Sequence, residues 1–203
     1  DIDVYTHPKL TLLKLGQLPA LRSLKCYFND ALSFLSFKGA TNLSDVQCGS
    51  NPKLSVIEVD DYLKITSLNI SGCAFQSLDF VRHLSLLTGL ACDDNQLTML
   101  DVSANSSLRY LSCSDNEDLI RLKIPEQDSS NPILQILDCR FCSLDKDELN
   151  TIFNTLTVVP IRYPGYPSDY RITFNGNPGA EPDLCDQKIL EDKGWNIEVK
   201  PRI

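Results

Sequence analysis

Apolar residues recur along the chain in a six-residue pattern, L-x-x-L-x-C, whose first, fourth and sixth positions are apolar. The pattern repeats at intervals of about 22 residues. Its copies are LRSLKC (21–26), LSDVQC (43–48), ITSLNI (65–70), LTGLAC (87–92), LRYLSC (108–113) and LQILDC (134–139). Because alternate side chains of a strand point to opposite faces, each copy predicts a short strand with an inward apolar face and an outward face.

A second column of residues keeps the same period. Three residues after each copy comes asparagine or cysteine: Asn29, Asn51, Cys73, Asn95, Asn116 and Cys142. An asparagine amide can bond backbone groups of the neighbouring turn where the chain leaves the strand. Cysteine can replace it as a small, weakly polar residue. The column therefore predicts a ladder of side-chain hydrogen bonds along one corner of the repeat.

Half a period away, a related pattern predicts a second short strand in most turns. It occurs as LSFLSF (32–37), LSVIEV (54–59), LTMLDV (97–102) and LIRLKI (119–124). The third turn has SLDFVRHL (77–84) instead, where Leu78, Val81 and Leu84 are spaced for a helical turn. A single turn cannot bury its apolar face, so the turns are expected to stack into a solenoid.

The whole chain is expected to be one domain. Residues 1–17 are assigned to an N-terminal cap, 18–144 to the repeats and 145–203 to a C-terminal cap. In the C-terminal cap, Asp145 and Glu148 have the spacing of a helix capping pair. The elements expected there are a helix at 145–156, a strand at 171–174, a helix at 183–193 that Gly194 ends, and a strand at 195–199. Strand, helix and strand in this order predict a parallel crossover unit that continues the repeat sheet.

The motif L-x-x-L-x-C-x-x-N-x-L, seen in LTGLACDDNQL (87–97) and continued by TMLDVSANSSLRYLSCSDN (98–116), resembles that of leucine-rich repeat proteins. The motif closely resembles the short repeats of Bacteroidetes and spirochaete surface proteins, and NGNPG (175–179) and KGW (193–195) resemble the C-terminal cap of such Bacteroidetes chains. The resemblance implies an α/β fold, a leucine-rich repeat solenoid of about six turns with a parallel sheet. It also implies an exported, often lipid-anchored bacterial surface protein that binds other molecules.

Composition and charge argue against nucleic-acid binding and against a membrane-spanning segment. The chain has 203 residues and a net charge of −8, which argues against nucleic-acid binding because a phosphate backbone needs a basic partner. No apolar run approaches the roughly 20 residues of a membrane span. No leader opens the sequence, so we expect any export signal to have been removed, and we expect an extracellular or cell-surface location with a lipid anchor as an upstream possibility.

The repeat accounts for seven of the eight cysteines, and only Cys185 lies outside it. We therefore expect free thiols rather than a disulfide framework. Cys139 and Cys142 are the sixth and ninth positions of one repeat, which argues against half a zinc site. We expect no catalytic residue, no metal and no cofactor. The two histidines, His7 and His83, lie apart from the expected binding face.

Outward positions on the repeat strands are the candidate partner-binding residues: Tyr27, Phe28, Asp93, Asp94, Tyr110, Asp115, Asp138, Arg140 and Phe141. Exposed aromatic residues are typical anchors of interfaces. Asp94 and Asp115 occupy the same position on adjacent turns, about 4.8 Å apart. A column of like charges is unfavourable unless something relieves it. Three interpretations remain open: a solvated corner, a basic protein partner, or bound Ca²⁺.

The sequence thus predicts a non-enzymatic protein–protein interaction module that binds through the exposed face of the repeat sheet. A glycan-binding surface protein, resting on the aromatic residues, is the alternative. A polysaccharide-processing enzyme with a parallel β-helix is a weaker alternative, in which Asp93, Asp94, Asp115 and Asp138 would supply acid, base and calcium ligands. No known nucleophile, phosphate-binding or zinc-protease motif supports an enzyme.

Overall fold

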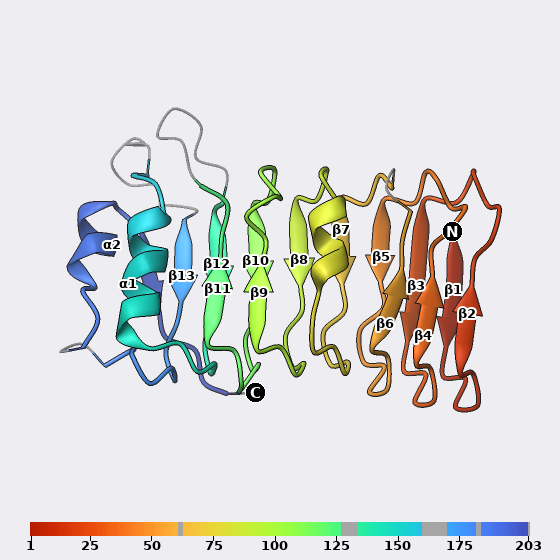
Figure 1. The fold of residues 1–203 in the computed structure, drawn as a ribbon, viewed down its shortest axis with the longest axis horizontal. Coiled ribbons are helices and arrows are strands. Elements are labelled where there is room, and N and C mark those ends of the chain that lie inside the picture. The colour runs from red at the N-terminus through yellow and green to blue at the C-terminus, as the bar shows by residue number, and fades with distance from the viewer. Residues whose placement is uncertain (61–62, 127–133, 160–169, 182–183, 203) are drawn as a thin grey trace.

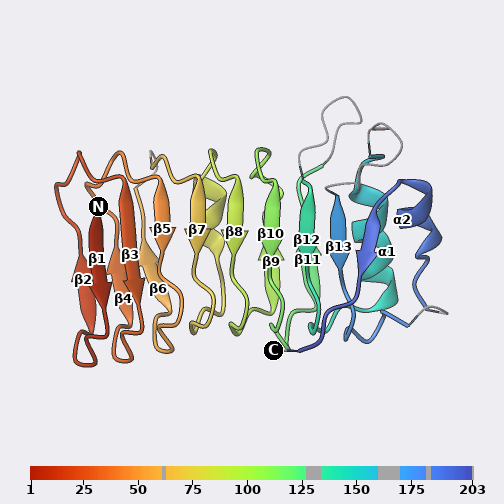
Figure 2. The ribbon, with the colours of Figure 1, turned by 180° about the vertical axis from the view of Figure 1, so that it is seen from behind.

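Parallel strands stack side by side along the long axis of the molecule and form one nine-stranded sheet (Figures 1 and 2). The computed structural model describes residues 1–60, 63–126, 134–159, 170–181 and 184–202. The strands of this sheet, in spatial order, are β1 (Ile2–Tyr5), β3 (Ser23–Tyr27), β5 (Asp45–Gln47), β7 (Ser67–Asn69), β8 (Gly89–Ala91), β10 (Tyr110–Ser112), β12 (Ile136–Asp138), β13 (Arg171–Thr173) and β14 (Asn196–Glu198). The expected solenoid with a parallel sheet is confirmed.

The opposite side of the solenoid is more varied. β2 (Leu12–Lys14), β4 (Phe34–Ser36) and β6 (Val56–Glu58) form a three-stranded sheet, and β9 (Met99–Asp101) pairs with β11 (Arg121–Lys123). Between these two small sheets along the chain lies η1 (Asp79–His83), a 3-10 helix that buries Val81. The helical turn predicted for the third repeat is confirmed. After β11, the helix α1 (Lys146–Thr155) takes the place of a further strand on this side (Figure 1).

Neighbouring strands pair without any shift in register, so equivalent repeat positions lie in straight columns. Leu24 pairs with Val46, Leu111 with Leu137, and Leu137 with Ile172, and all of these side chains are buried. Cysteines of the sixth position form the next inward column and are equally buried. These two columns and the buried apolar residues of the opposite side, such as Leu35 and Leu100, form one core, at roughly 25 cal/mol for each Å² of apolar surface removed from water.

The predicted ladder is present. The amide of Asn51 donates from Nδ2 to the carbonyl oxygens of Cys26, at 2.7 Å, and of Cys48, at 2.8 Å. Its Oδ1 accepts from the backbone N–H of Asn29 at 2.9 Å, so one side chain links two turns. Where cysteine stands in the ladder, the Cys142 thiol donates to the Cys113 carbonyl at 3.3 Å.

The ladder extends beyond the six predicted turns. The sequence pattern places Asn177 in a turn, but its Nδ2 donates to the Cys139 carbonyl at 2.8 Å and its Oδ1 accepts from the Leu144 backbone N–H at 3.0 Å. At the other end, the backbone N–H of His7 donates to Asn29 Oδ1 at 3.0 Å. Residues 1–17, expected as a cap, carry β1 and β2, which pair with β3 and β4 as another turn of the solenoid.

The C-terminal region continues the nine-stranded sheet by β13 and β14, as predicted. Asp145 caps α1 by accepting the Glu148 N–H at 2.9 Å. The second helix, α2 (Lys188–Asp192), is shorter than the predicted 183–193, whose first residue lies outside the described part of the chain; before it begins, the N–H groups of Leu184 and Cys185 donate to the Glu181 carbonyl. Gly194 ends the helix in the left-handed conformation, with φ of +79°.

All eight cysteines are free thiols and all are buried, Cys185 included. Burial raises the pKa of the Cys73 thiol to about 11, and it raises the pKa values of Cys92 and Cys139 well above the ordinary value. These side chains are therefore uncharged core residues.

Candidate functional site

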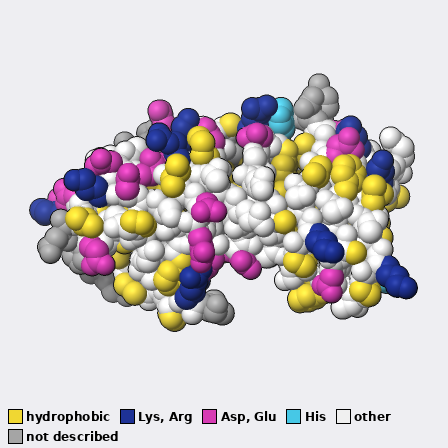
Figure 3. Space-filling model, turned by 60° about the horizontal axis from the view of Figure 1, so that its bottom comes forward, with side chains coloured by type: hydrophobic (Ala, Val, Ile, Leu, Met, Phe, Trp, Pro, Cys, Tyr) yellow, Lys and Arg dark blue, Asp and Glu magenta, His cyan; other side chains and the backbone are white. Residues whose placement is uncertain are grey.

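A polar groove of about 550 Å³ opens on the solvent side of the nine-stranded sheet, at the carboxyl ends of β8, β10 and β12. It is lined by Asp93, Asp94, Tyr110, Ser112, Ser114, Asp115, Asp138, Arg140 and Arg202. Because the strands pair without a shift, equivalent corner residues of three turns meet here. Figure 3 looks toward this edge and shows acidic side chains gathered near the middle of the molecule, with basic side chains beside them.

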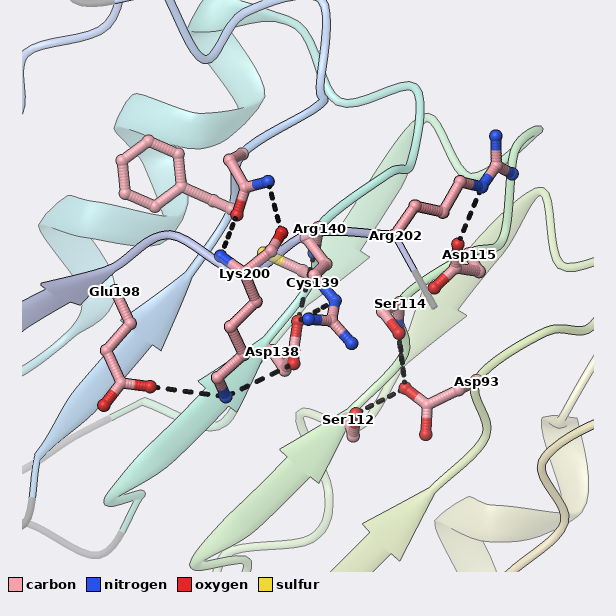
Figure 4. A network of polar contacts seen from close by, with 12 residues as sticks. Asp93, Ser112, Ser114, Asp115, Asp138, Cys139, Arg140, Glu198, Lys200 and Arg202 are labelled. Atoms are coloured by element: carbon pink, nitrogen blue, oxygen red, sulfur yellow. Dashed lines mark hydrogen bonds and ion pairs between the residues drawn. The ribbon is translucent and has the colours of Figure 1, made fainter.

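Asp93 forms the floor of the polar groove, and its carboxylate is held by serine side chains of neighbouring turns (Figure 4). Its Oδ1 accepts from the hydroxyls of Ser112 and Ser114, the latter at 2.9 Å, and from the Ser114 backbone N–H at 2.9 Å. Its Oδ2 accepts from the Ser71 hydroxyl at 3.1 Å. Ser112 has an outward position on the binding face that the sequence predicts, whereas Ser114 is a site residue that the prediction missed, although its outward position beside Cys113 is the signal that could have found it.

Asp138 and Arg140 form one wall of the groove and are both buried, which corrects the prediction that they are exposed binding residues. The Arg140 Nε lies 3.6 Å from Asp138 Oδ1, and Lys200 Nζ lies 3.8 Å from Asp138 Oδ2. Desolvation raises the pKa of the Asp138 carboxyl, although the charges of Arg140 and Lys200 act in the opposite direction. Near the end of the chain, the Lys200 side chain lies beside Asp138 (Figure 4).

We call residues Val199–Arg202 the C-terminal arm. Asn175 holds it by donating from Nδ2 to the Lys200 carbonyl at 2.9 Å and by accepting the Lys200 N–H at 3.2 Å. The Arg202 Nε then reaches Asp115 Oδ1 at 3.1 Å, and its guanidinium also contacts the Glu117 carboxylate (Figure 4). Arg202 is absent from the predicted site residues, and no local signal marks it, because its partner Asp115 is 87 positions away.

Asp94 and Asp115 occupy equivalent corners, as predicted, and both have left-handed backbones with φ of +51° and +57°. Aspartate tolerates this conformation better than most residues. Arg202 relieves the repulsion at Asp115 from within the same chain. Asp94 is exposed, and it has no ion-pair partner among the residues that the structure describes.

The predicted aromatic residues divide between the two ends of the sheet. Tyr27 is half-buried, its ring stacks on Tyr5 with centroids 5.9 Å apart, and its hydroxyl donates to Gln47 Oε1 at 3.0 Å. Phe28 beside it is 58% exposed. We call Tyr5, Tyr27 and Phe28 the aromatic row; it lies near β1, far along the sheet from the polar groove (Figure 2).

Tyr110 and Phe141 lie at the groove end. The Tyr110 side chain is among the residues lining the polar groove, and the residue is 40% exposed. The Phe141 ring is half-buried under Arg202, whose guanidinium lies 5.7 Å from the ring centroid. Gly176 packs so closely on this ring that a Cβ there would overlap it. The nine candidate residues therefore form two separate groups rather than one site.

Within the described residues, no group of three or more histidine, cysteine, aspartate or glutamate side chains is placed to hold a metal ion. No described helix is long and apolar enough to cross a membrane.

No protein family and no curated protein matches the sequence. Among solved structures, the chain is similar to a leucine-rich repeat protein described as the functional domain of InlJ from Listeria monocytogenes, which includes a cysteine ladder. The TM-score is 0.62 at 23% identity, over 90% of this chain and 35% of the InlJ chain. This chain therefore spans about a third of the length of its structural neighbour, and the likeness establishes the leucine-rich repeat fold.

Proposed function

We propose that this chain is a leucine-rich repeat interaction module that binds a protein through the solvent side of its nine-stranded sheet. The polar groove is the observation that carries the proposal. Asp93 is held by several hydrogen bonds there, and Arg140 is fixed beside Asp138. Because these side chains are already ordered, binding loses little side-chain entropy. Tyrosine and arginine beside one another are also typical of interface anchors.

The proposed location is the surface of a bacterial cell, where the exported protein would be held by a lipid attached upstream of Asp1. The resemblance of its repeats to surface proteins of Bacteroidetes and spirochaetes supports this proposal, and so does the likeness to a bacterial leucine-rich repeat structure. Proteins that act outside the cell meet macromolecular partners, which suits a rigid, open binding face.

We propose that the module has no enzymatic activity. Glycoside hydrolysis needs one carboxylic acid and one free carboxylate facing the scissile bond. In the polar groove, Asp93 accepts from serine hydroxyls, Asp115 pairs with Arg202, and Asp138 pairs with Arg140. Three of the four candidate carboxylates are therefore engaged in hydrogen bonds or ion pairs with groups of the protein itself.

Glycan binding is the second candidate, and the aromatic row favours it. The Tyr5 and Tyr27 rings are nearly parallel, with 7° between their planes, and Phe28 continues the row at 6.1 Å from Tyr27. The apolar face of a sugar ring packs on such aromatic faces. This candidate places the ligand at the other end of the sheet from the polar groove.

Two exposed sites allow a direct test that leaves the core intact. The purified chain would be immobilised and screened against a panel of matrix proteins and a glycan array. The groove variant carries Asp94→Asn and Tyr110→Ala, the aromatic variant carries Tyr5→Ala and Phe28→Ala, and the control carries Met99→Ala on the opposite side. We expect a protein ligand whose binding falls at least about tenfold in the groove variant only.

A glycan ligand lost only in the aromatic variant would support the second candidate. Binding that both of these variants retain and that Met99→Ala abolishes would contradict both, because it would place the ligand on the other side of the solenoid.

A further inference from the structure

The C-terminal arm lies in the polar groove as a bound peptide would. Lys200 Nζ lies 3.8 Å from Asp138 and 3.3 Å from Glu198 of β14, and Arg202 contacts Asp115 and Glu117. Pro201 separates the two basic residues and favours an extended chain. The arm has no regular structure of its own, and its backbone is tied only to Asn175 within the described residues.

The groove keeps an excess of negative charge even with the arm in place. Its four aspartates, Asp93, Asp94, Asp115 and Asp138, face three cations, Arg140, Lys200 and Arg202. Glu117 adds a further acid at the rim. Asp94 is exposed one strand spacing, about 4.8 Å, from the equivalent position of Asp115. A second cation could therefore bind beside the one that Arg202 supplies.

Arg140 indicates that a ligand of the groove must also supply a hydrogen-bond acceptor. The residue is only 7% exposed, and its Nε has no hydrogen-bond partner within the described part of the chain, since Asp138 lies 3.6 Å away. Its guanidinium reaches from the end of β12 into the space beside Ser114 (Figure 4). A buried donor is costly unless an acceptor meets it. A bare cation cannot supply an acceptor, whereas the main-chain carbonyls of an extended peptide can.

We propose that the polar groove binds an extended basic segment of a partner protein, and that the C-terminal arm occupies part of this groove when the partner is absent. The arm's own spacing, a lysine and an arginine separated by one residue, is the pattern that the groove accepts. The partner's cations take the places of Lys200 beside Asp138 and of Arg202 beside Asp115, the exposed Asp94 adds to their attraction, and one of the partner's carbonyls meets Arg140.

The arm can be displaced because its contacts are exposed. The side chains of Arg202 and Lys200 are 55% and 41% exposed, and ion pairs at such sites contribute little stability. A partner that fills the groove and also reaches Asp94 makes contacts that the arm does not make. Since charge drives this binding, raising the salt concentration weakens it.

This inference rests on the proposed function and identifies the partner chemistry of the same site. The test uses a fluorescein-labelled peptide with the sequence of residues 198–203, EVKPRI, and the full chain, with fluorescence anisotropy as the readout. Arg202→Ala removes the ion pairs by which the arm competes for Asp115 and Glu117. We expect it to bind the peptide about fivefold or more tightly than the natural chain, because the apparent affinity rises with the fraction of open groove.

Arg22→Ala is the matched control, since it removes the same charge from an exposed residue beside β3, far from the groove. We expect this variant to bind the peptide as the natural chain does. Adding Asp94→Asn and Asp115→Asn to Arg202→Ala should abolish the gain, and the peptide EVEPEI should not bind.

Equal affinities of the natural chain and the Arg202→Ala variant would overturn the proposal, as would equal binding of EVKPRI and EVEPEI or no binding of EVKPRI by any variant. The proposed function fails separately. A protein ligand that depends on Tyr110 but is insensitive to Asp94→Asn and to salt would keep that function while overturning the basic-segment inference.

Discussion

At the scale of the residue, the ladder asparagines donate hydrogen bonds to buried carbonyl oxygens and accept one from a backbone N–H of the neighbouring turn, which leucine cannot do. Asn51 is fully buried, and it satisfies the carbonyl oxygens of Cys26, Cys48 and Gly49 at the corner where the chain leaves the strand. Its oxygen accepts the Asn29 N–H of the preceding turn. Buried backbone groups without such partners would each oppose folding.

Replacing Asn51 by alanine should therefore lower the free energy of unfolding by about 2–4 kcal/mol, because several buried backbone groups lose their partner. Asn51→Cys should cost less, since cysteine occupies the equivalent ladder positions at Cys73 and Cys142 and its thiol donates to one carbonyl. Urea denaturation measures both. A loss below about 0.5 kcal/mol in Asn51→Ala would contradict the role assigned to the ladder.

At the scale of the element, α1 takes the position of a strand next to β11, on the side of the solenoid opposite the nine-stranded sheet (Figure 1). Leu149, Ile152 and Phe153 are its buried residues, and they face the solenoid core. The sequence predicts Glu148 as the second half of a capping pair with Asp145. In the structure Asp145 does accept the Glu148 N–H, but the Glu148 carboxylate accepts the Leu122 N–H of β11 at 2.9 Å. This bond ties the helix to the edge of the two-stranded sheet.

Glu148→Ala should destabilise the chain by about 1–3 kcal/mol, because it leaves the Leu122 N–H without its acceptor. Asp147→Ala is the control, since it removes a neighbouring carboxylate of the same first turn that is exposed, and it should cost about 0.5 kcal/mol or less. Urea denaturation measures the loss, and amide hydrogen exchange should show faster exchange at Leu122 only in Glu148→Ala. Similar losses for both variants would mean that the helix N-terminus, rather than the sheet edge, is what matters.

At the scale of the whole molecule, each turn adds equivalent buried residues to the same columns, so the stability of the fold depends on contributions from turns along the whole solenoid. Each turn contacts only its neighbours, and most of the buried cysteines are core residues whose ionisation burial disfavours, although a hydrogen bond with Cys48 lowers the pKa of Cys26. Burial raises the pKa of Cys73 to about 11 and raises the pKa values of Cys92 and Cys139 well above their ordinary value. In the unfolded chain the same thiols ionise near pH 9.

The free energy of unfolding should therefore fall above about pH 9. Between the unfolded and folded pKa values the native state binds more protons than the unfolded state, so stability decreases as pH rises, by about 1.4 kcal/mol per pH unit for each such thiol. Urea denaturation with reductant at pH 8, 9 and 10 measures the slope, and eight thiols should titrate after unfolding. A stability that is constant from pH 8 to 10 would contradict this account.

Local periodicity in the amino-acid sequence is enough to predict the repeat, the two strands in most turns, the ladder and the column that places Asp94 beside Asp115. These follow from local periodicity, because strands that pair without a register shift turn sequence period directly into spatial columns. The cap helix and its Asp145 cap follow in the same way from short-range pattern.

Which outward residues stay exposed depends on contacts between distant segments of the chain. Asp138 and Arg140 have the pattern of surface residues but are buried, and Arg202 neutralises Asp115 across 87 positions. The physical reason is that the repeat fixes the direction of a side chain, whereas its exposure depends on which distant segment covers it. The C-terminal arm carries no periodic signal, so its path over the groove is set by the long-range contacts of Asn175, Asp138 and Asp115.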